Sequence, residues 1–112
     1  MVEYRQRLDA AYGALSSEAR RVIVRALLDG ERRVTDVARP FDMSLAAVSK
    51  HIRVLEDAGI VRRRVEGRTH WLSIDPGPLA AAGDWIAATR VFWEGRIDAL
   101  EALVTEPQSG RR

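Results

Sequence analysis

The 112-residue sequence predicts a mainly α-helical domain with a small two-stranded antiparallel β-hairpin. Three observations support this fold class. Apolar residues recur at helical spacing over most of the chain, the period changes to two between residues 60 and 74, and glycine or proline stands at the boundaries. About five helices follow from these boundaries. The composition, 46% apolar and 30% charged, suits one modest core, so we predict a single domain over residues 1–105 and a disordered tail over 106–112.

The first helix is predicted over about the first fifteen residues. Its apolar positions, which include Leu8 and Tyr12, recur at helical spacing and form a stripe that needs a partner surface. Ser16 or Ser17 then caps a second helix, because a serine oxygen at that position accepts a hydrogen bond from a free backbone N–H group. Gly30 ends this second helix.

A short third helix is predicted around Val34–Arg39, where Pro40 prevents its continuation. After a tight turn, Ser44 caps a longer fourth helix that Gly59 ends. The fourth helix has two unlike faces, since successive residues are 100° apart. Its apolar face is predicted to hold Leu45, Val48, Ile52 and Leu55. Its opposite face is small and polar and holds Ala46, Ser49, Lys50 and Arg53.

A hairpin is predicted from two β-rich runs, Ile60–Val65 and Arg68–Ile74, separated by a tight turn at Glu66-Gly67. Its four arginines are Arg62, Arg63, Arg64 and Arg68. Arg62, Arg63 and Arg64 either reach nucleic-acid phosphates or simply keep an exposed strand edge soluble, whereas Arg68 is the preferred candidate for DNA contact. Because strand residues alternate between faces, Arg63 is predicted to point away from its two neighbours.

The last helix follows a Pro- and Gly-rich segment and carries a second apolar stripe with three aromatic residues. An apolar helical stripe is more often an interface than a ligand pocket, and pairing it with the first helix across a twofold axis would bury both. The predicted dimer interface therefore consists of Leu8, Tyr12, Trp85, Phe92, Trp93 and Leu100.

Charge and cysteine content exclude several classes of protein. Eighteen basic and sixteen acidic residues leave a net charge of only +2, so any basic patch is local. Without cysteine there is no disulfide framework and no thiolate metal site, which fits a reducing cytoplasm. His51 and His70 lie on separate elements, so we expect no metal and no cofactor. No apolar stretch is long enough for a membrane span, and no catalytic motif of an enzyme is present.

The predicted order is helix, helix, short helix, tight turn, longer helix, hairpin and helix, which is a winged helix-turn-helix. An α-helix fits the major groove of B-DNA, and a basic hairpin reaches flanking phosphates or the minor groove. The sequence therefore predicts a protein that binds a double-stranded DNA operator. The alternative is a winged-helix module that holds another protein and does not bind DNA specifically.

The chain resembles the ArsR/SmtB-type winged-helix transcriptional regulators in three segments, Leu15–Arg21, Val34–Ala38 and above all Met43–Val61, with Gly67-Arg68 opening the second wing strand. The resemblance covers nearly the whole chain. It implies a homodimeric repressor that binds an operator inverted repeat and leaves it when a signal arrives. The DNA-contact positions that it implies are Ser44, Ala46, Ala47, Ser49, Lys50, Arg53 and Arg68.

The chain departs from the metal-sensing members of that family. It has no cysteine, and its last helix has no histidine that could pair with Asp84. It therefore resembles the branch without a recognised metal site, and a non-metal signal is expected. A small-molecule effector bound between the terminal helices of the dimer is one hypothesis for that signal, motivated by the three aromatic residues. The operator sequence, the regulated genes and the choice between repressor and activator do not follow from the sequence.

Overall fold

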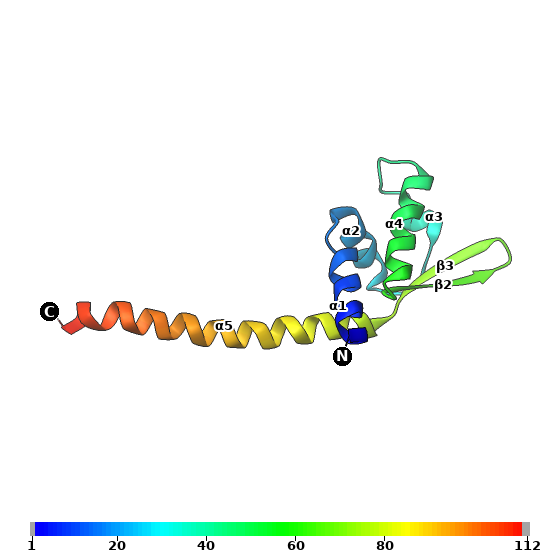
Figure 1. The fold of residues 1–112 in the computed structure, drawn as a ribbon. Helices are drawn as coiled ribbons and strands as arrows, with labels where there is room; N and C mark the ends of the chain where they lie inside the picture. The colour runs from blue at the N-terminus through cyan, green and yellow to red at the C-terminus, as the bar shows by residue number, and fades with distance from the viewer. Residues whose placement is uncertain (1, 111–112) are drawn as a thin grey trace. The chain divides into compact units, whose positions relative to one another are not determined.

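The structure, a computed structural model, describes the backbone of residues 2–110 and the side chains of residues 2–104. This part of the chain forms five helices and three strands. Figure 1 labels the five helices and the two longer strands. The helices are α1 Val2–Ala14, α2 Glu18–Leu27, α3 Val34–Ala38, α4 Leu45–Asp57 and α5 Pro76–Gly110. The strands are β1 Arg32–Arg33, β2 Val61–Glu66 and β3 Thr69–Ile74. The predicted mainly α-helical fold with a hairpin is confirmed.

The chain divides into two compact units, residues 1–82 and 83–112. The first unit holds α1 to α4, the three strands and the first turns of α5, and the second holds the rest of α5. The single domain over 1–105 and the disordered tail over 106–112 stay predictions. The backbone is helical as far as Gly110, and the last two residues of that tail lie outside the described residues.

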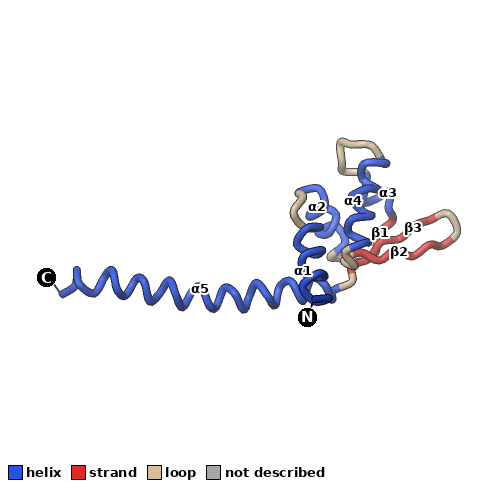
Figure 2. Tube along the Cα trace, viewed as in Figure 1, coloured by secondary structure: helices blue, strands red, loops and turns tan. Residues whose placement is uncertain are grey.

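The sheet has three antiparallel strands in the order β1-β3-β2, one more than the sequence predicts. The extra strand β1 is two exposed arginines that pair with Leu72 and Trp71, so it shows no alternation of apolar and polar residues. Glu66 pairs with Thr69, which leaves Gly67-Arg68 as the hairpin loop, one residue later than predicted. Figure 2 shows the hairpin reaching beyond the helices of the first unit. We call β2, β3 and this loop the wing.

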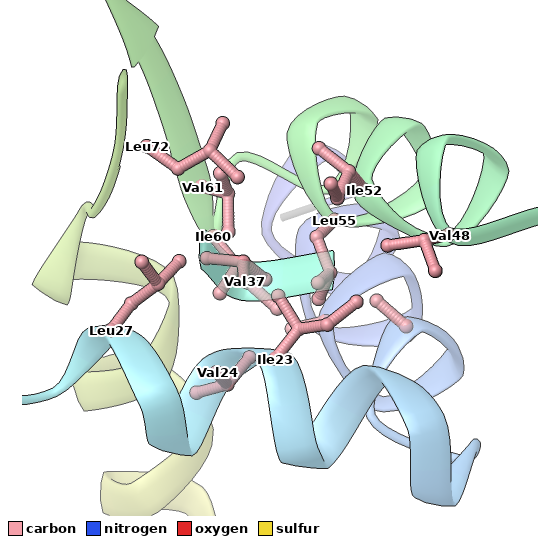
Figure 3. Packing of buried hydrophobic residues seen from close by; sticks show 12 residues of the cluster. Ile23, Val24, Leu27, Val37, Val48, Ile52, Leu55, Ile60, Val61 and Leu72 are labelled. Carbon is pink, nitrogen blue, oxygen red and sulfur yellow. The ribbon is translucent and has the colours of Figure 1, made fainter. Parts of the chain in front are cut away.

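The core of the first unit lies where α2, α4 and the sheet meet (Figure 3). Its largest fully buried side chains are Ile23, Leu27, Val48, Ile52, Leu55, Ile60 and Leu72. Val48, Ile52 and Leu55 bury the predicted apolar face of α4, but Leu45 is 54% exposed. The prediction for Leu45 is wrong because the buried face of α4 begins one turn later, at Val48.

Candidate nucleic-acid interface

Helix α4 begins at a serine cap. The Oγ atom of Ser44 accepts a hydrogen bond from the backbone N–H of Ala47 at 3.1 Å, which satisfies one of the free N–H groups of the first turn. The other end is followed by Gly59 with a φ of 77°, a left-handed conformation that glycine adopts without strain. One side of the helix is fixed in the core, and its opposite side is consequently available at the surface.

The predicted contact residues on α4 lie on this available side. Ser44, Ala46, Ser49, Lys50 and Arg53 are exposed, and Ala47 is half-buried. The small side chains of Ala46 and Ser49 allow close approach to another backbone. Within residues 2–104, neither Lys50 nor Arg53 makes a hydrogen bond or ion pair, so both positive charges are available to an incoming anion.

A groove of about 640 Å³ separates α4 from the wing. Its helix side is formed by Ser49, Lys50 and Arg53, and its wing side by Arg63 and His70. Glu56 and Asp57 complete its lining. The groove therefore brings together the two elements that the sequence assigns to DNA, with cationic side chains on both walls.

Three wing arginines are already engaged by carboxylates. Arg62 pairs with Asp75 at 2.9 Å, and Arg63 pairs with Glu56 at 2.9 Å. Arg64 pairs with Glu31 at 2.7 Å and with Glu66 at 3.1 Å. Arg63 points to α4 whereas its two neighbours do not, as the alternation predicts. The charges of these three arginines are balanced within the chain, which is a supporting role in the wing that differs from both roles open from the sequence.

The carboxyl groups in these pairs are held in the ionised form. Hydrogen bonds from the guanidinium of Arg63 lower the pKa of Glu56, and those from Arg64 lower the pKa of Glu31. The pKa of Asp75 is lowered first by the backbone N–H of Gly77 and then by Arg62. Charged partners therefore persist at neutral pH, and the wing arginines keep their acceptors.

Arg68 differs from the other wing arginines. It is exposed in the hairpin loop directly after Gly67, whose φ of 62° supplies the left-handed residue that a tight turn requires. It makes no ion pair or hydrogen bond with any residue whose side chain is described. It is the wing arginine that has a charge available at the tip.

The two histidines have arginine partners. Arg20 donates to Nδ1 of His51 at 3.1 Å, and the same guanidinium donates to the carbonyl oxygens of Gly13 and Ala14 at the end of α1. His51 is thus part of a junction of α1, α2 and α4. His70 lies in the wing and accepts from Arg63.

Glu56 was not predicted as a functional candidate from the sequence. Its contact with Arg63 depends on how the wing packs against α4, which local sequence patterns do not show.

The residues predicted for the dimer interface fall into two groups. Leu8 is buried in the first unit, and Tyr12 donates from its hydroxyl to the carbonyl oxygen of Ala82 at 2.9 Å. Both side chains make these contacts within their own chain, and their place in a dimer interface stays a prediction. The other four, Trp85, Phe92, Trp93 and Leu100, are about half exposed or more on the second unit.

Further exposed apolar side chains, missed in that prediction, lie on the same segment. They are Ile86, Val91, Ile97, Leu103 and Val104. The Phe92 and Trp93 rings meet edge to face, with centroids 5.5 Å apart, and Arg96 lies over the Phe92 ring at 4.9 Å. We call the exposed apolar residues from Trp85 to Val104 the α5 stripe.

The described residues also bear on metal binding and on membrane insertion. No group of three or more His, Cys, Asp or Glu side chains in this part of the chain is placed to hold a metal ion. No helix described here has the length and apolar character that crossing a membrane requires.

Comparisons with known families and curated proteins point to DNA-binding regulators. A family model described as a helix-turn-helix domain matches residues 15–64. The HTH-type transcriptional regulator Rv2034 of Mycobacterium tuberculosis is 40% identical over 73 residues, which is 65% of this chain and 68% of that protein. The cadmium resistance transcriptional regulatory protein CadC homolog of Staphylococcus aureus is 40% identical over 65 residues, 57% of this chain and 54% of that protein.

Solved structures agree with this result. The ArsR family transcriptional regulator RHA00566 is 34% identical, with a TM-score of 0.75 over 80% of this chain and 93% of that chain. The homodimeric winged helix-turn-helix DNA-binding domain of Mb0332 from Mycobacterium bovis is 27% identical, with a TM-score of 0.61 over 91% of this chain and 86% of that chain.

Proposed function

Because the chain belongs to the ArsR family of winged helix-turn-helix transcriptional regulators, we propose that it is a homodimeric repressor of an inverted-repeat DNA operator, released by a non-metal signal. The observation that carries the proposal is the exposed face of α4. This helix buries one side in the core and presents Ser49, Lys50 and Arg53 to solvent on the other. A helix held in this way is suited to enter a major groove.

The proposed DNA contacts divide by chemistry. Ala46, Ala47 and Ser49 let the helix approach base edges closely, Ser44 lies at the helix start, and Lys50 and Arg53 bind phosphates or guanine edges. Arg68 at the wing tip reaches a flanking phosphate or the minor groove. These groups act by binding alone, so we propose no catalysis. Their place of action is the compartment with the DNA, which the sequence predicts to be the cytoplasm.

Dimerisation is proposed for the α5 stripe, including Trp85, Phe92, Trp93 and Leu100. Exposed apolar area of this extent on a small chain is costly in water, and a second copy would cover it. The homodimeric relative from Mycobacterium bovis supports the same assembly. In such a dimer the two copies of α4, one from each chain, would act as recognition helices related by a twofold axis. They would read half-sites about one turn of the DNA double helix apart, or a multiple of that.

Release requires a signal that does not depend on cysteine, since the chain has none. A hollow of about 550 Å³ in the first unit offers a site for a small-molecule effector. Residues of α1, of the end of α4 and of the first turns of α5 line it, among them Tyr4, Leu8, Asp57 and Pro78. A molecule there would touch the helix that is proposed to read DNA and would lie within one chain, whereas the sequence predicts such a pocket in the dimer interface between the terminal helices.

The test is a titration of the purified chain against labelled DNA from upstream of its own gene, and against duplexes selected from a random library. Competitor DNA and two salt concentrations are included. A protected palindrome that survives competitor, with affinity that falls as salt rises, is the expected result. Binding that disappears with competitor for every duplex would instead favour the protein-interaction module.

A further inference from the structure

Three side chains outside the proposed DNA contacts join α4 to the wing. Arg63 on β2 donates from Nε and Nη2 to the two carboxylate oxygens of Glu56, at 3.0 and 2.9 Å. Its remaining Nη1 donates to Nδ1 of His70 on β3, at 3.0 Å. One guanidinium therefore connects the last turn of α4 with both strands of the wing. We call Glu56, Arg63 and His70 the helix–wing bracket.

The bracket is the best shielded ion pair among the residues with described side chains. The side chains of Arg63 and Glu56 are 28% and 26% exposed, whereas the arginine of every other described pair is at least 49% exposed. The two parallel N–H···O bonds fix both distance and orientation, which a single hydrogen bond does not. The arrangement is therefore suited to hold an angle between two elements.

The bracket also fixes which nitrogen of its histidine accepts. Because the guanidinium has only donors, Nδ1 of His70 must accept from it. Arg63 on β2 and His70 on β3 are therefore joined by a side-chain hydrogen bond in addition to the backbone pairing of the two strands.

The position of the bracket relates it to the proposed DNA contacts. Arg63 and His70 line the groove that contains Lys50 and Arg53, and they also line a second hollow that contains Arg68. The bracket accordingly stands between the cations of the recognition helix and the free arginine of the wing tip. The bracket is therefore placed where it can set the spacing between these two sets of charges.

We propose that Glu56, Arg63 and His70 are positioning residues, which set the wing against α4 so that helix and wing tip engage one DNA duplex together. This inference rests on the proposed function. Beyond Trp71, where the pairing with β1 ends, the wing continues as two strands only, and a two-stranded ribbon is marginally stable unless another element supports it. When the wing is already held before binding, less conformational entropy is lost as the complex forms. The resulting gain in affinity applies to specific complexes, in which α4 and the wing both contact the DNA.

Whether Glu56→Gln raises or lowers operator affinity distinguishes a positioning role from a simple charge effect. Glu56→Gln and Asp57→Asn change adjacent residues, both lining the groove, and each removes one negative charge. Asp57 makes no side-chain hydrogen bond or ion pair with the rest of the described chain, so Asp57→Asn reports charge alone. Less negative charge near DNA favours binding, so Asp57→Asn is expected to bind as tightly as the parent or tighter. Glu56→Gln is expected to bind the selected operator about tenfold more weakly.

The measurement is fluorescence anisotropy with the selected operator and with an unrelated duplex of equal length. Glu56→Gln should lose affinity for the operator and keep or gain affinity for the unrelated duplex, so that the ratio of the two affinities falls. Circular dichroism melts confirm that each variant is folded at the assay temperature. Should Glu56→Gln not fold, Arg63→Lys serves instead, since it keeps the charge and removes the paired hydrogen bonds.

A double-mutant cycle tests the link to the wing tip. Arg68→Ala should weaken operator binding in the parent, and by a clearly smaller factor in the Glu56→Gln background, because the tip is no longer placed. Arg62→Gln is the matched control, since it neutralises a charge on the same strand and breaks only the pair with Asp75. In that background, Arg68→Ala should keep its full effect.

Two results would overturn the inference. One is a Glu56→Gln variant that matches Asp57→Asn on both duplexes. The other is an Arg68→Ala effect of equal size in the parent and in Glu56→Gln. A failure of the proposed function is a separate outcome, because then the unaltered protein selects no duplex from the library and does not bind the upstream fragment.

Discussion

The two compact units of the chain place their apolar side chains differently. In residues 1–82, helices and sheet bury a contiguous core. In residues 83–104, where side chains are described, no residue is buried and every large apolar side chain is at least 48% exposed. Both units have apolar residues at helical spacing. Helical spacing of apolar residues therefore predicts a helix face that is buried in an assembly, but not whether the same chain or a second copy buries it.

The largest effect is expected when the same substitution is made in each of the two units. Ile52 is fully buried and Ile97 is 52% exposed. Ile52→Ala leaves a cavity and should lower the free energy of unfolding by about 2–5 kcal/mol in urea denaturation. Ile97→Ala should leave the urea midpoint of the dilute monomer nearly unchanged and weaken self-association in sedimentation. Equal destabilisation by both would contradict the assignment of the α5 stripe to a second copy.

Next in size is the effect of a charge on the α5 stripe. Leu100→Glu should give a monomer in sedimentation velocity, because a carboxylate would have to be buried without a partner. Loss of paired binding should then weaken operator affinity by about a hundredfold, since the two half-sites no longer act together. Leu28→Glu is the matched control. Leu28 is exposed to the same degree but lies on the first unit, and its variant should remain dimeric.

The sequence predicted the helices and the exposed polar side of α4 because both follow from local rules. Ser44, Gly59 and the spacing of Val48 to Leu55 determine where the helix begins, ends and turns its apolar face. The predicted fold class depended on these signals, and the structure confirms it. The DNA-binding residues themselves and the dimer interface stay predictions until binding is measured.

The features that the sequence did not predict depend on pairing between distant residues. Strand β1 exists because Arg32 and Arg33 pair with β3, nearly forty residues later. Arg64 has its acceptor in Glu31, 33 residues away. Propensity and periodicity describe neighbours in the sequence, so they do not show which carboxylate an arginine meets. The alternation of strand residues predicts that Arg63 points away from its two neighbours. This was the one feature of the sequence that pointed to the helix–wing bracket.

A third prediction concerns the exposed face of α4. Ser49→Ala combined with Arg53→Ala should weaken specific operator binding by about 1–3 kcal/mol for each of the two side chains, since both face solvent and are free to reach bases or phosphates. The melting temperature should hardly change, because neither residue is in the core. Arg25→Ala removes an exposed charge from α2 and serves as the control in the same anisotropy titration. Unaltered affinity in the double variant would refute the assignment of this face to DNA.

The smallest expected effect is the acid dependence of stability at the helix–wing bracket. Arg63 holds the pKa of Glu56 below its ordinary range in the folded chain. Such a group stabilises the fold above its unfolded pKa of about 4.3, and this contribution is lost as the pH falls through the lower folded value. Solvent screening keeps it under about 1 kcal/mol. Glu56→Gln should therefore be slightly less stable at pH 7 and lose less stability between about pH 5 and 3, as urea midpoints at each pH would show. If urea midpoints plotted against pH run parallel for parent and variant, the Glu56–Arg63 pair does not stabilise the first unit. Its contribution to free energy would then lie in the DNA complex, through the orientation of the wing.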